Sequence, residues 1–221
     1  MAWPKRLVLV RHAESEGNVL SKEERARYDR ATHAYQLTER GRKQARITGQ
    51  FLKATFGEFD VYYVSYYERS KETMNIMFPD ARIREDPRLA EAQRGIWQTM
   101  TDEQVRTRFP EEFDRREREG LYHYRPFGGE NWPDIELRIH SFLGTLSRDC
   151  CGQSVLMVVH GHWLILLQRL LHHFPTEEAV ARYMGGTFAN ASVTVYAGDQ
   201  EKEPSRLVLL SENQIPWEGK L

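Results

Sequence analysis

Short apolar runs alternate with longer amphipathic stretches along most of this chain. Leu7–Val10 and Val155–Val159 are uninterrupted aliphatic runs, the pattern expected of strands that are covered on both faces. Val61–Val64 predicts a further strand, and the last strands are expected at Ala191–Ala197 and Leu207–Leu210. Strands separated by helical segments indicate an α/β fold, a sandwich built around a largely parallel sheet.

The helices between these strands are marked by apolar residues that recur every three or four positions. Residues 45–56 carry this pattern behind Thr38, which is a suitable N-cap for an amphipathic helix. Glu68–Met77 and Trp163–Leu171 are predicted as helices that directly follow strands. Each strand therefore leads into a helix, as in a doubly wound sheet.

The stretch from about residue 101 to residue 132 departs from this alternation. It is rich in charged residues, contains Pro110 and Pro126, and shows no strand pattern. We interpret it as a helical insertion that covers one end of the sheet within a single domain spanning residues 1–221. The polar segment Ser21–Arg30 is predicted to form a smaller helical lid.

The composition is that of an ordinary globular chain. Lys and Arg total 31 and Asp and Glu total 32 in 221 residues, so the formal net charge is −1. This balance gives no general reason to bind nucleic acid or an anionic membrane. No apolar run approaches the roughly 18 residues of a membrane span, and none has the form of a secretory signal. The two cysteines are adjacent and cannot frame a disulfide scaffold, so we expect a cytoplasmic protein.

Residues with catalytic potential follow the predicted strands. Arg11 and His12 come directly after the first strand, Arg69 shortly after the second, and His160 after the strand near residue 155. Glu91 lies in a loop that follows a further short strand. Because ligands bind beyond the carboxyl ends of strands in sheets of this kind, we expect these side chains to converge.

This set of residues is suited to phosphoryl transfer without a metal or an organic cofactor. The planar guanidinium groups of Arg11 and Arg69 match phosphate oxygens, and their charge keeps a neighbouring imidazole neutral and nucleophilic. Attack on phosphorus by that imidazole would form a phosphohistidine and divide one difficult displacement into two easier ones. A carboxyl group could protonate the leaving oxygen and then accept a proton from water.

The segment Arg11–Asn18 closely resembles the signature of the histidine phosphatase superfamily, which includes the cofactor-dependent phosphoglycerate mutases. Further motifs follow in the family's order, namely Leu37–Gly41, Ser65 with Arg69, Leu89–Trp97, Gly128–Glu130, His160–Gly161 and Asn190–Ser192. The resemblance extends over about residues 6 to 198. It implies a three-layer α/β/α sandwich and a phosphatase that hydrolyses small phosphorylated substrates through a phosphohistidine.

Carried over by position, the resemblance implies a role for each motif residue. His12 would be the nucleophile and Glu91 the general acid and base, while Arg11, Arg69 and His160 would form the phosphate pocket. The residues expected to bind substrate are Gly17, Asn18, Gly161 and His162. His162 departs from the family pattern, which often has a small residue or Asn at this position.

Three alternatives to a phosphatase remain open from the sequence. A mutase-type phosphoryl transferase is the first, although mutases typically carry Glu-Arg-His-Tyr-Gly where this chain has Glu91-Ala92-Gln93-Arg94-Gly95. A metal-dependent hydrolase could use His160 and His162 as a ligand pair. The third is a phosphate-binding or interaction module without turnover. The sequence indicates neither the physiological substrate nor the oligomeric state.

Overall fold

A mixed six-stranded sheet organises the structure, a computed structural model that describes residues 3–199 and 206–221. Its strands lie in the order β3-β2-β4-β1-β5-β6. The first four are mutually parallel, β5 runs antiparallel to β1, and β6 runs antiparallel to β5. Their bounds are β1 Arg6–Arg11, β2 Val61–Val64, β3 Ile83–Glu85, β4 Ser154–Val159, β5 Val193–Asp199 and β6 Arg206–Gln214. The mostly parallel sheet is confirmed.

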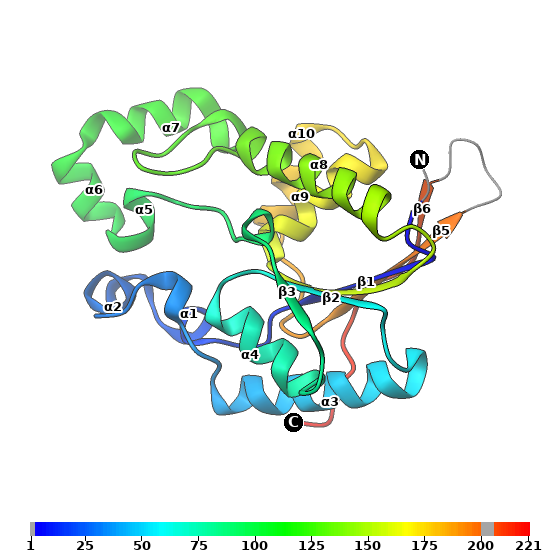
Figure 1. Cartoon of the computed structure of the whole chain (residues 1–221). Helices are drawn as coiled ribbons and strands as arrows, with labels where there is room; N and C mark the ends of the chain where they lie inside the picture. The colour runs from blue at the N-terminus through cyan, green and yellow to red at the C-terminus, as the bar shows by residue number, and fades with distance from the viewer. Residues whose placement is uncertain (1–2, 200–205) are drawn as a thin grey trace.

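Helices cover both faces of this sheet (Figure 1). α3 (Glu39–Phe56) and α4 (Glu68–Met77) lie below it in that view, and α8 (Trp132–Asp149) and α9 (Gly161–His172) lie above it. α10 (Thr176–Met184) packs against α9. The predicted three-layer α/β/α sandwich is therefore confirmed.

The aliphatic strands are buried on both faces because their side chains point alternately into two hydrophobic cores, one on each side of the sheet. In β1, Leu7 and Leu9 belong to the core beneath α8 and α9, whereas Val8 and Val10 belong to the core on the α3 side. All four side chains are fully buried. This double burial explains the uninterrupted apolar run. The predicted N-cap of α3 is also present, since the Thr38 hydroxyl accepts a hydrogen bond from the backbone N–H of Gly41 at 2.9 Å.

One expected boundary is wrong for a local reason. The strand expected from Ala191 begins at Val193, because Ala191 adopts a left-handed φ of 51°. Its backbone N–H donates to the carbonyl oxygen of Arg11 at 3.0 Å, which turns the chain before β5 begins. This contact ties the start of β5 to the carboxyl end of β1.

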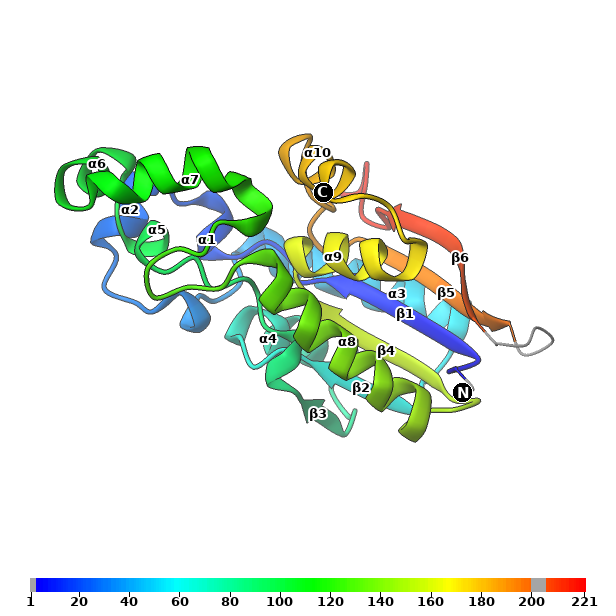
Figure 2. The ribbon, with the colours of Figure 1, turned by 90° about the horizontal axis from the view of Figure 1, so that it is seen from above.

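Short helices gather beyond the carboxyl end of the parallel strands (Figures 1 and 2). They are α1 Glu16–Val19, α2 Lys22–Arg27, η1 Thr32–Ala34, α5 Ile96–Thr99, α6 Asp102–Arg108 and α7 Pro110–His123. A last 3-10 turn, η2, spans Pro87–Leu89 and precedes the loop that contains Glu91. Within the described ranges, no helix has both the length and the apolar character needed to cross a bilayer.

Candidate active site

The two predicted histidines meet because β1 and β4 are adjacent parallel strands in register. Arg11 pairs with Val159, and the backbone N–H of His12 donates to the carbonyl oxygen of Val159 at 2.9 Å. His12 and His160 are the residues that directly follow these two strands, and they therefore leave the sheet side by side. Their ring centroids lie 5.1 Å apart, and both rings are buried.

The contacts of His12 define the protonation of its ring. Nδ1 lies 2.8 Å from the carbonyl oxygen of Ala13, which can only accept, so Nδ1 carries the proton. Nε2 lies 3.1 Å from Nε of Arg69, which can only donate, so Nε2 carries the lone pair. Burial, followed by the positive charges of Arg69 and Arg11, lowers the pKa of His12 well below its ordinary value. The ring is therefore neutral, with its nucleophilic nitrogen towards a guanidinium group.

Arg69, on the first turn of α4, connects the two histidines. Besides its bond to His12, its Nη2 donates to Nδ1 of His160 at 3.2 Å and its Nη1 to the carbonyl oxygen of Thr32 at 2.9 Å. Its guanidinium carbon lies 4.4 Å from the ring centroid of Tyr67. Burial lowers the pKa of Arg69 to about 10, so the side chain stays charged at neutral pH.

Arg11 supplies a second buried cation. Its Nη1 donates to Oγ1 of Thr187 at 3.1 Å and also contacts the carbonyl oxygen of Phe188. Its Nε is buried and has no hydrogen-bond partner in the described part of the chain. Burial lowers the pKa of Arg11, and the charge of Glu91 partly opposes that shift. A buried N–H without a partner is available to an oxygen of a bound anion.

His160 lies behind Arg69, outside the cavity wall. Its Nδ1 accepts from Arg69, and its Nε2 lies 2.9 Å from the hydroxyl of Ser65 and 3.4 Å from that of Ser70. The neutral ring therefore donates from Nε2 to a serine hydroxyl. Burial, followed by the charge of Arg69 and the proximity of His12, lowers the pKa of His160 well below its ordinary value.

A cavity of about 390 Å³ opens from these residues towards α2 and α7. Of the sequence-predicted site residues, those that line it are Arg11, His12, Gly17, Asn18, Arg69, Glu91 and His162. His160 and Gly161 do not. A Cβ at Gly161 would lie 3.0 Å from Cβ of Thr187 and 3.4 Å from Nε of Arg11. This glycine thus allows the start of α9 to approach the side chain of Arg11.

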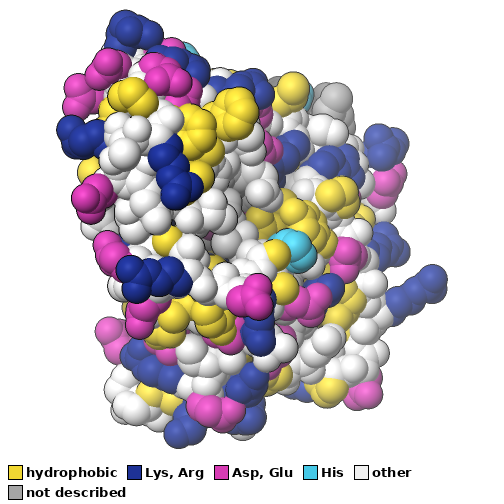
Figure 3. All heavy atoms as spheres, turned by 90° about the vertical axis from the view of Figure 1, so that its left-hand side faces the viewer, with side chains coloured by type: hydrophobic (Ala, Val, Ile, Leu, Met, Phe, Trp, Pro, Cys, Tyr) yellow, Lys and Arg dark blue, Asp and Glu magenta, His cyan; other side chains and the backbone are white. Residues whose placement is uncertain are grey.

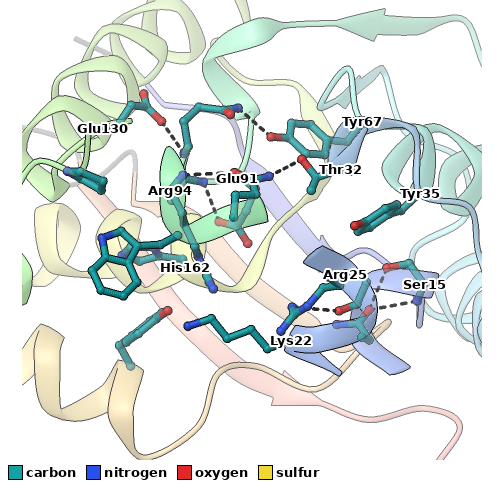
Figure 4. Close-up of a pocket in the computed structure, with 18 of the residues that line it drawn as sticks. Ser15, Lys22, Arg25, Thr32, Tyr35, Tyr67, Glu91, Arg94, Glu130 and His162 are labelled. Carbon is teal, nitrogen blue, oxygen red and sulfur yellow. Dashed lines mark hydrogen bonds between the residues drawn. The ribbon is translucent and has the colours of Figure 1, made fainter. Parts of the chain in front are cut away.

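The carboxylate of Glu91 faces this cavity from a loop that is held firmly in place (Figure 4). Arg138, on α8, donates to the carbonyl oxygens of Arg88 at 2.8 Å and Ala90 at 2.7 Å. It also pairs with Glu130 at 2.9 Å, and Glu130 accepts from the backbone N–H of Gln93 at 3.0 Å. Contacts on both sides of Glu91 therefore fix the backbone that presents it.

Two glycines let this loop lie directly against the segment 126–130. Gly95 has a φ of 52°, and a Cβ there would lie 2.1 Å from the carbonyl oxygen of Phe127. A Cβ on Gly129 would lie 2.5 Å from the carbonyl oxygen of Gln93. Both positions require glycine because the two backbone segments lie so close together. Two sequence motifs about 30 residues apart therefore meet in a single contact.

His162 also lines the cavity, from the first turn of α9. Its ring packs against Trp132 with centroids 4.4 Å apart and against Tyr183 with centroids 4.8 Å apart. Neither ring nitrogen has a hydrogen-bond partner in the described part of the chain. Burial lowers the pKa of His162 to about 4, so this ring is neutral.

The arrangement favours an anion over a metal ion. Within residues 3–199 and 206–221, no three His, Cys, Asp or Glu side chains form a group that could hold a metal. His160 is bonded to Arg69 and Ser65, whereas His162 packs against Trp132, so this pair is not arranged as metal ligands. The geometry provides no support for the metal-dependent alternative.

A protein-family model matches nearly the whole chain. The sequence matches the model of the histidine phosphatase superfamily (branch 1) over residues 7–211. The chain belongs to the histidine phosphatase superfamily. The resemblance noted in the sequence is thus confirmed.

The chain is similar to superfamily members that are named for different activities. Phosphoserine phosphatase 1 of Hydrogenobacter thermophilus is 34% identical over 159 residues, which cover 70% of this chain and 70% of that protein. Phosphoglycerate mutase-like protein AT74 of Arabidopsis thaliana is 37% identical over 160 residues, or 66% of this chain. The chain spans only about half the length of AT74 and of the related AT74H, 48% and 54% respectively.

A solved structure from the superfamily has the same architecture. The mycobacterial glucosyl-3-phosphoglycerate phosphatase in complex with VO3 aligns with a TM-score of 0.72 at 25% identity. The alignment covers 95% of this chain and 99% of that one. The fold described above is therefore that of a histidine phosphatase over nearly its whole extent.

Sequence reasoning missed several residues that shape this histidine phosphatase site. Ser70 contacts His160 through its hydroxyl, and the carbonyl oxygen of Thr32 accepts a hydrogen bond from Arg69. Arg138 donates a hydrogen bond to the backbone of the loop that contains Glu91. Tyr67 packs its ring against both Arg69 and His160. Of these, Tyr67 and Ser70 could have been suspected from their positions next to Arg69, at the start of α4. Thr32 and Arg138 lie outside the motifs, and nothing local in the sequence marks them.

Proposed function

We propose that the chain is a metal-independent phosphomonoesterase that hydrolyses small phosphorylated substrates through a phosphohistidine on His12. One observation carries the proposal, the neutral His12 ring whose Nε2 lone pair is held 3.1 Å from Arg69. A phosphoryl group in the cavity would replace that contact, with its oxygens on Arg69 and Arg11. This arrangement supplies both a nucleophile and the charges that bind phosphate.

In the first step, Nε2 of His12 attacks phosphorus. The Nε2–P bond forms and the ester P–O bond breaks, while the Glu91 carboxyl group gives its proton to the leaving alkoxide. Arg69 and Arg11 neutralise the charge on the phosphoryl oxygens throughout. The ring gains positive charge as it is phosphorylated, and the Ala13 carbonyl oxygen that accepts from Nδ1–H at 2.8 Å stabilises that charge.

In the second step, water attacks the phosphohistidine. The Glu91 carboxylate accepts a proton from the water, the new P–O bond forms, and the Nε2–P bond breaks. Inorganic phosphate is released, and His12 returns to its neutral form. The two proposed steps require no metal ion, redox partner or phosphorylated primer.

Of the remaining predicted site residues, Asn18 is proposed to bind the substrate directly, whereas Gly17, Gly161 and His160 are proposed to position neighbouring groups. Asn18 accepts hydrogen bonds through Oδ1 from Ser15 and Asn190, at 3.0 Å and 3.3 Å, which leaves its amide NH2 as a donor for substrate. Gly17 lines the cavity and leaves room for the ring of Tyr35, whereas Gly161 lets the start of α9 lie close to Arg11. His160 fixes the guanidinium of Arg69 from behind.

We further propose that residues 101–132, which contain α6 and α7, are a helical insertion within a single domain spanning residues 1–221. We also propose that the enzyme acts in the cytoplasm on small molecules, without a nucleic-acid partner. Both cysteines are free, Cys150 buried and Cys151 exposed, which suits a reducing compartment. The small size of the cavity supports a small substrate.

A test of the proposed function measures phosphate release from p-nitrophenyl phosphate and a panel of alkyl phosphates, with and without EDTA. We expect multiple turnovers in both conditions, abolished by His12→Gln and retained by the control His140→Gln, which changes an exposed histidine of α8. Loss of activity with EDTA would contradict metal independence. Phosphoryl transfer only in the presence of a bisphosphate primer would indicate the mutase alternative. Binding without turnover would indicate a phosphate-binding module.

A further inference from the structure

The outer part of the cavity contains more positive charge than one phosphate requires. Of the described residues, six Lys or Arg side chains and two Glu side chains line it. Glu130 is already paired with Arg138 at 2.9 Å, which leaves Glu91 as the one lining carboxylate outside an ion pair. Arg11 and Arg69 suffice for a phosphoryl group at His12. The other cations, Lys22, Arg25, Arg94 and Arg116, face the outer part.

Three of these outer cations have no anionic partner. Lys22 pairs with Asp102, whereas Arg25, Arg94 and Arg116 have no carboxylate within ion-pairing distance in the described part of the chain. On the outer face that bears α2 and α6, basic side chains are instead interspersed with acidic and hydrophobic ones (Figure 3). The unbalanced charge is therefore a property of the cavity.

Aromatic rings contact three of the outer cations at the cavity wall. The guanidinium carbon of Arg116 lies 4.8 Å from the ring centroid of Trp97, and Nζ of Lys22 lies 5.4 Å from it. The guanidinium carbon of Arg94 lies 6.0 Å from the ring centroid of Tyr183. Such contacts orient a cation and leave its N–H donors free for a ligand.

His162 is the second, independent sign of a ligand here. It is 4% exposed, lines the cavity, and has no partner for either ring nitrogen. A buried polar group without a partner destabilises a fold unless a ligand or water satisfies it. Figure 4 shows His162, Arg94 and Lys22 reaching the same part of the cavity. A neutral imidazole N–H is a suitable donor to an anionic oxygen.

We propose that Arg94, Arg116 and His162 form a second anion subsite, so that the preferred substrate is a phosphomonoester whose leaving group carries a carboxylate or a second phosphate. The inference rests on the proposed function, since it places the leaving group beside Glu91. Arg94 follows Glu91 by three residues in one loop. The residue that protonates the leaving oxygen and the residue that binds its anionic end are thus held by the same backbone.

The test uses three phosphate esters with one three-carbon chain. They are 3-hydroxypropyl phosphate, 3-phosphonooxypropanoate and propane-1,3-diyl bisphosphate, which end in a hydroxyl, a carboxylate and a phosphate. We expect kcat/KM for phosphate release to be at least about tenfold higher for one of the two anionic esters than for the hydroxyl ester, after correcting the bisphosphate for its two equivalent groups. Which of the two is preferred identifies the anion.

Three variants complete the test. Arg94→Gln and Arg116→Gln should each reduce the preference for the anionic ester, whereas Arg118→Gln should preserve it, because Arg118 is an exposed residue of α7 outside the cavity wall. Equal kcat/KM for all three esters in the unmodified protein would overturn the subsite and leave the proposed function standing. A preference retained in both variants would also overturn it. Failure to hydrolyse any ester or p-nitrophenyl phosphate would instead contradict the proposed function.

Discussion

The inner and outer ends of the cavity are built in different ways. At the inner end, His12, Arg11 and Arg69 come from strand ends and the first turn of α4, and all are largely desolvated. At the outer end, Lys22, Arg94 and others come from short helices and loops, and Arg94 is exposed. The sheet register fixes the inner groups, whereas the outer groups depend on contacts between loops.

We expect the inner end of the cavity to determine the rate of phosphoryl transfer and the outer end to determine substrate preference. In the proposed reaction the inner groups act on the phosphoryl oxygens and phosphorus, which every phosphomonoester presents, so their loss should affect all substrates alike. In the proposed subsite the outer groups act only on the leaving group, so their loss should affect some substrates and spare others. Glu91 belongs to both ends, since it is the proposed acid for the leaving oxygen and lies on the loop that carries Arg94.

The largest expected effect is at the nucleophile. His12→Ala should lower kcat by about 10⁴-fold or more on every ester, because Nε2 of His12 is the atom that forms the covalent intermediate in the proposed mechanism. Steady-state phosphate release from aryl and alkyl esters measures this. Comparable activity in the variant, with the circular dichroism of the folded chain unchanged, would remove His12 from the mechanism.

The general acid should separate substrates by their leaving groups. Glu91→Gln should lower kcat/KM for alkyl phosphates by roughly 10³-fold and for p-nitrophenyl phosphate by much less, because p-nitrophenolate leaves without a proton. Glu85→Gln, at an exposed carboxylate of β3, is the matched control and should affect neither ester. Equal losses on both esters for Glu91→Gln would point to a different acid.

The phosphate pocket should show a smaller and uniform effect. Arg69→Gln should lower kcat/KM by about 10²-fold on alkyl and aryl esters alike, since its charge serves the phosphoryl group and not the leaving group. The control is Arg46→Gln, an exposed residue of α3. A loss confined to one class of ester would contradict the division between the inner and outer ends.

Acid should destabilise the fold through the buried histidines. Burial lowers the pKa of His12, His160 and His162 in the folded chain, whereas each returns to about 6.5 on unfolding. Below that pH the unfolded chain binds protons that the folded chain does not, so the free energy of unfolding falls as pH decreases. The fall at pH 5.5 relative to pH 7.5 is about 1.4 kcal/mol for each of the three. Denaturant unfolding at the two pH values measures it, and a constant free energy would contradict neutral buried rings.

The parts of the fold that could be predicted were those with a local signal. β1 and β4 are buried on both faces and therefore have uninterrupted apolar sequences, and the residues that follow them must lie at one sheet edge. The antiparallel direction of β5 was not predicted, because an apolar run does not encode strand direction. α8 was missed although Ile135, Ile139 and Phe142 recur at helical spacing, since it follows the charged insertion directly.

The supporting contacts of the site could not be predicted, because they depend on tertiary register. Nothing local to Arg138 shows that its guanidinium meets the carbonyl oxygens of the Glu91 loop, about 50 residues earlier. Nor does the sequence show that Trp132 and Tyr183 enclose His162. The catalytic residue types could thus be proposed from the motifs, whereas the groups that orient them required the structure.

The central claim is that phosphorus becomes bonded to Nε2 of His12 during turnover. Rapid acid-free quenching of the enzyme with a ³²P-labelled alkyl phosphate, followed by peptide mapping, tests it directly. We expect an acid-labile, base-stable phosphoryl group on the peptide that contains His12, formed before inorganic phosphate appears and absent from His12→Gln. Steady hydrolysis without any labelled peptide, or a label on another residue, would contradict it.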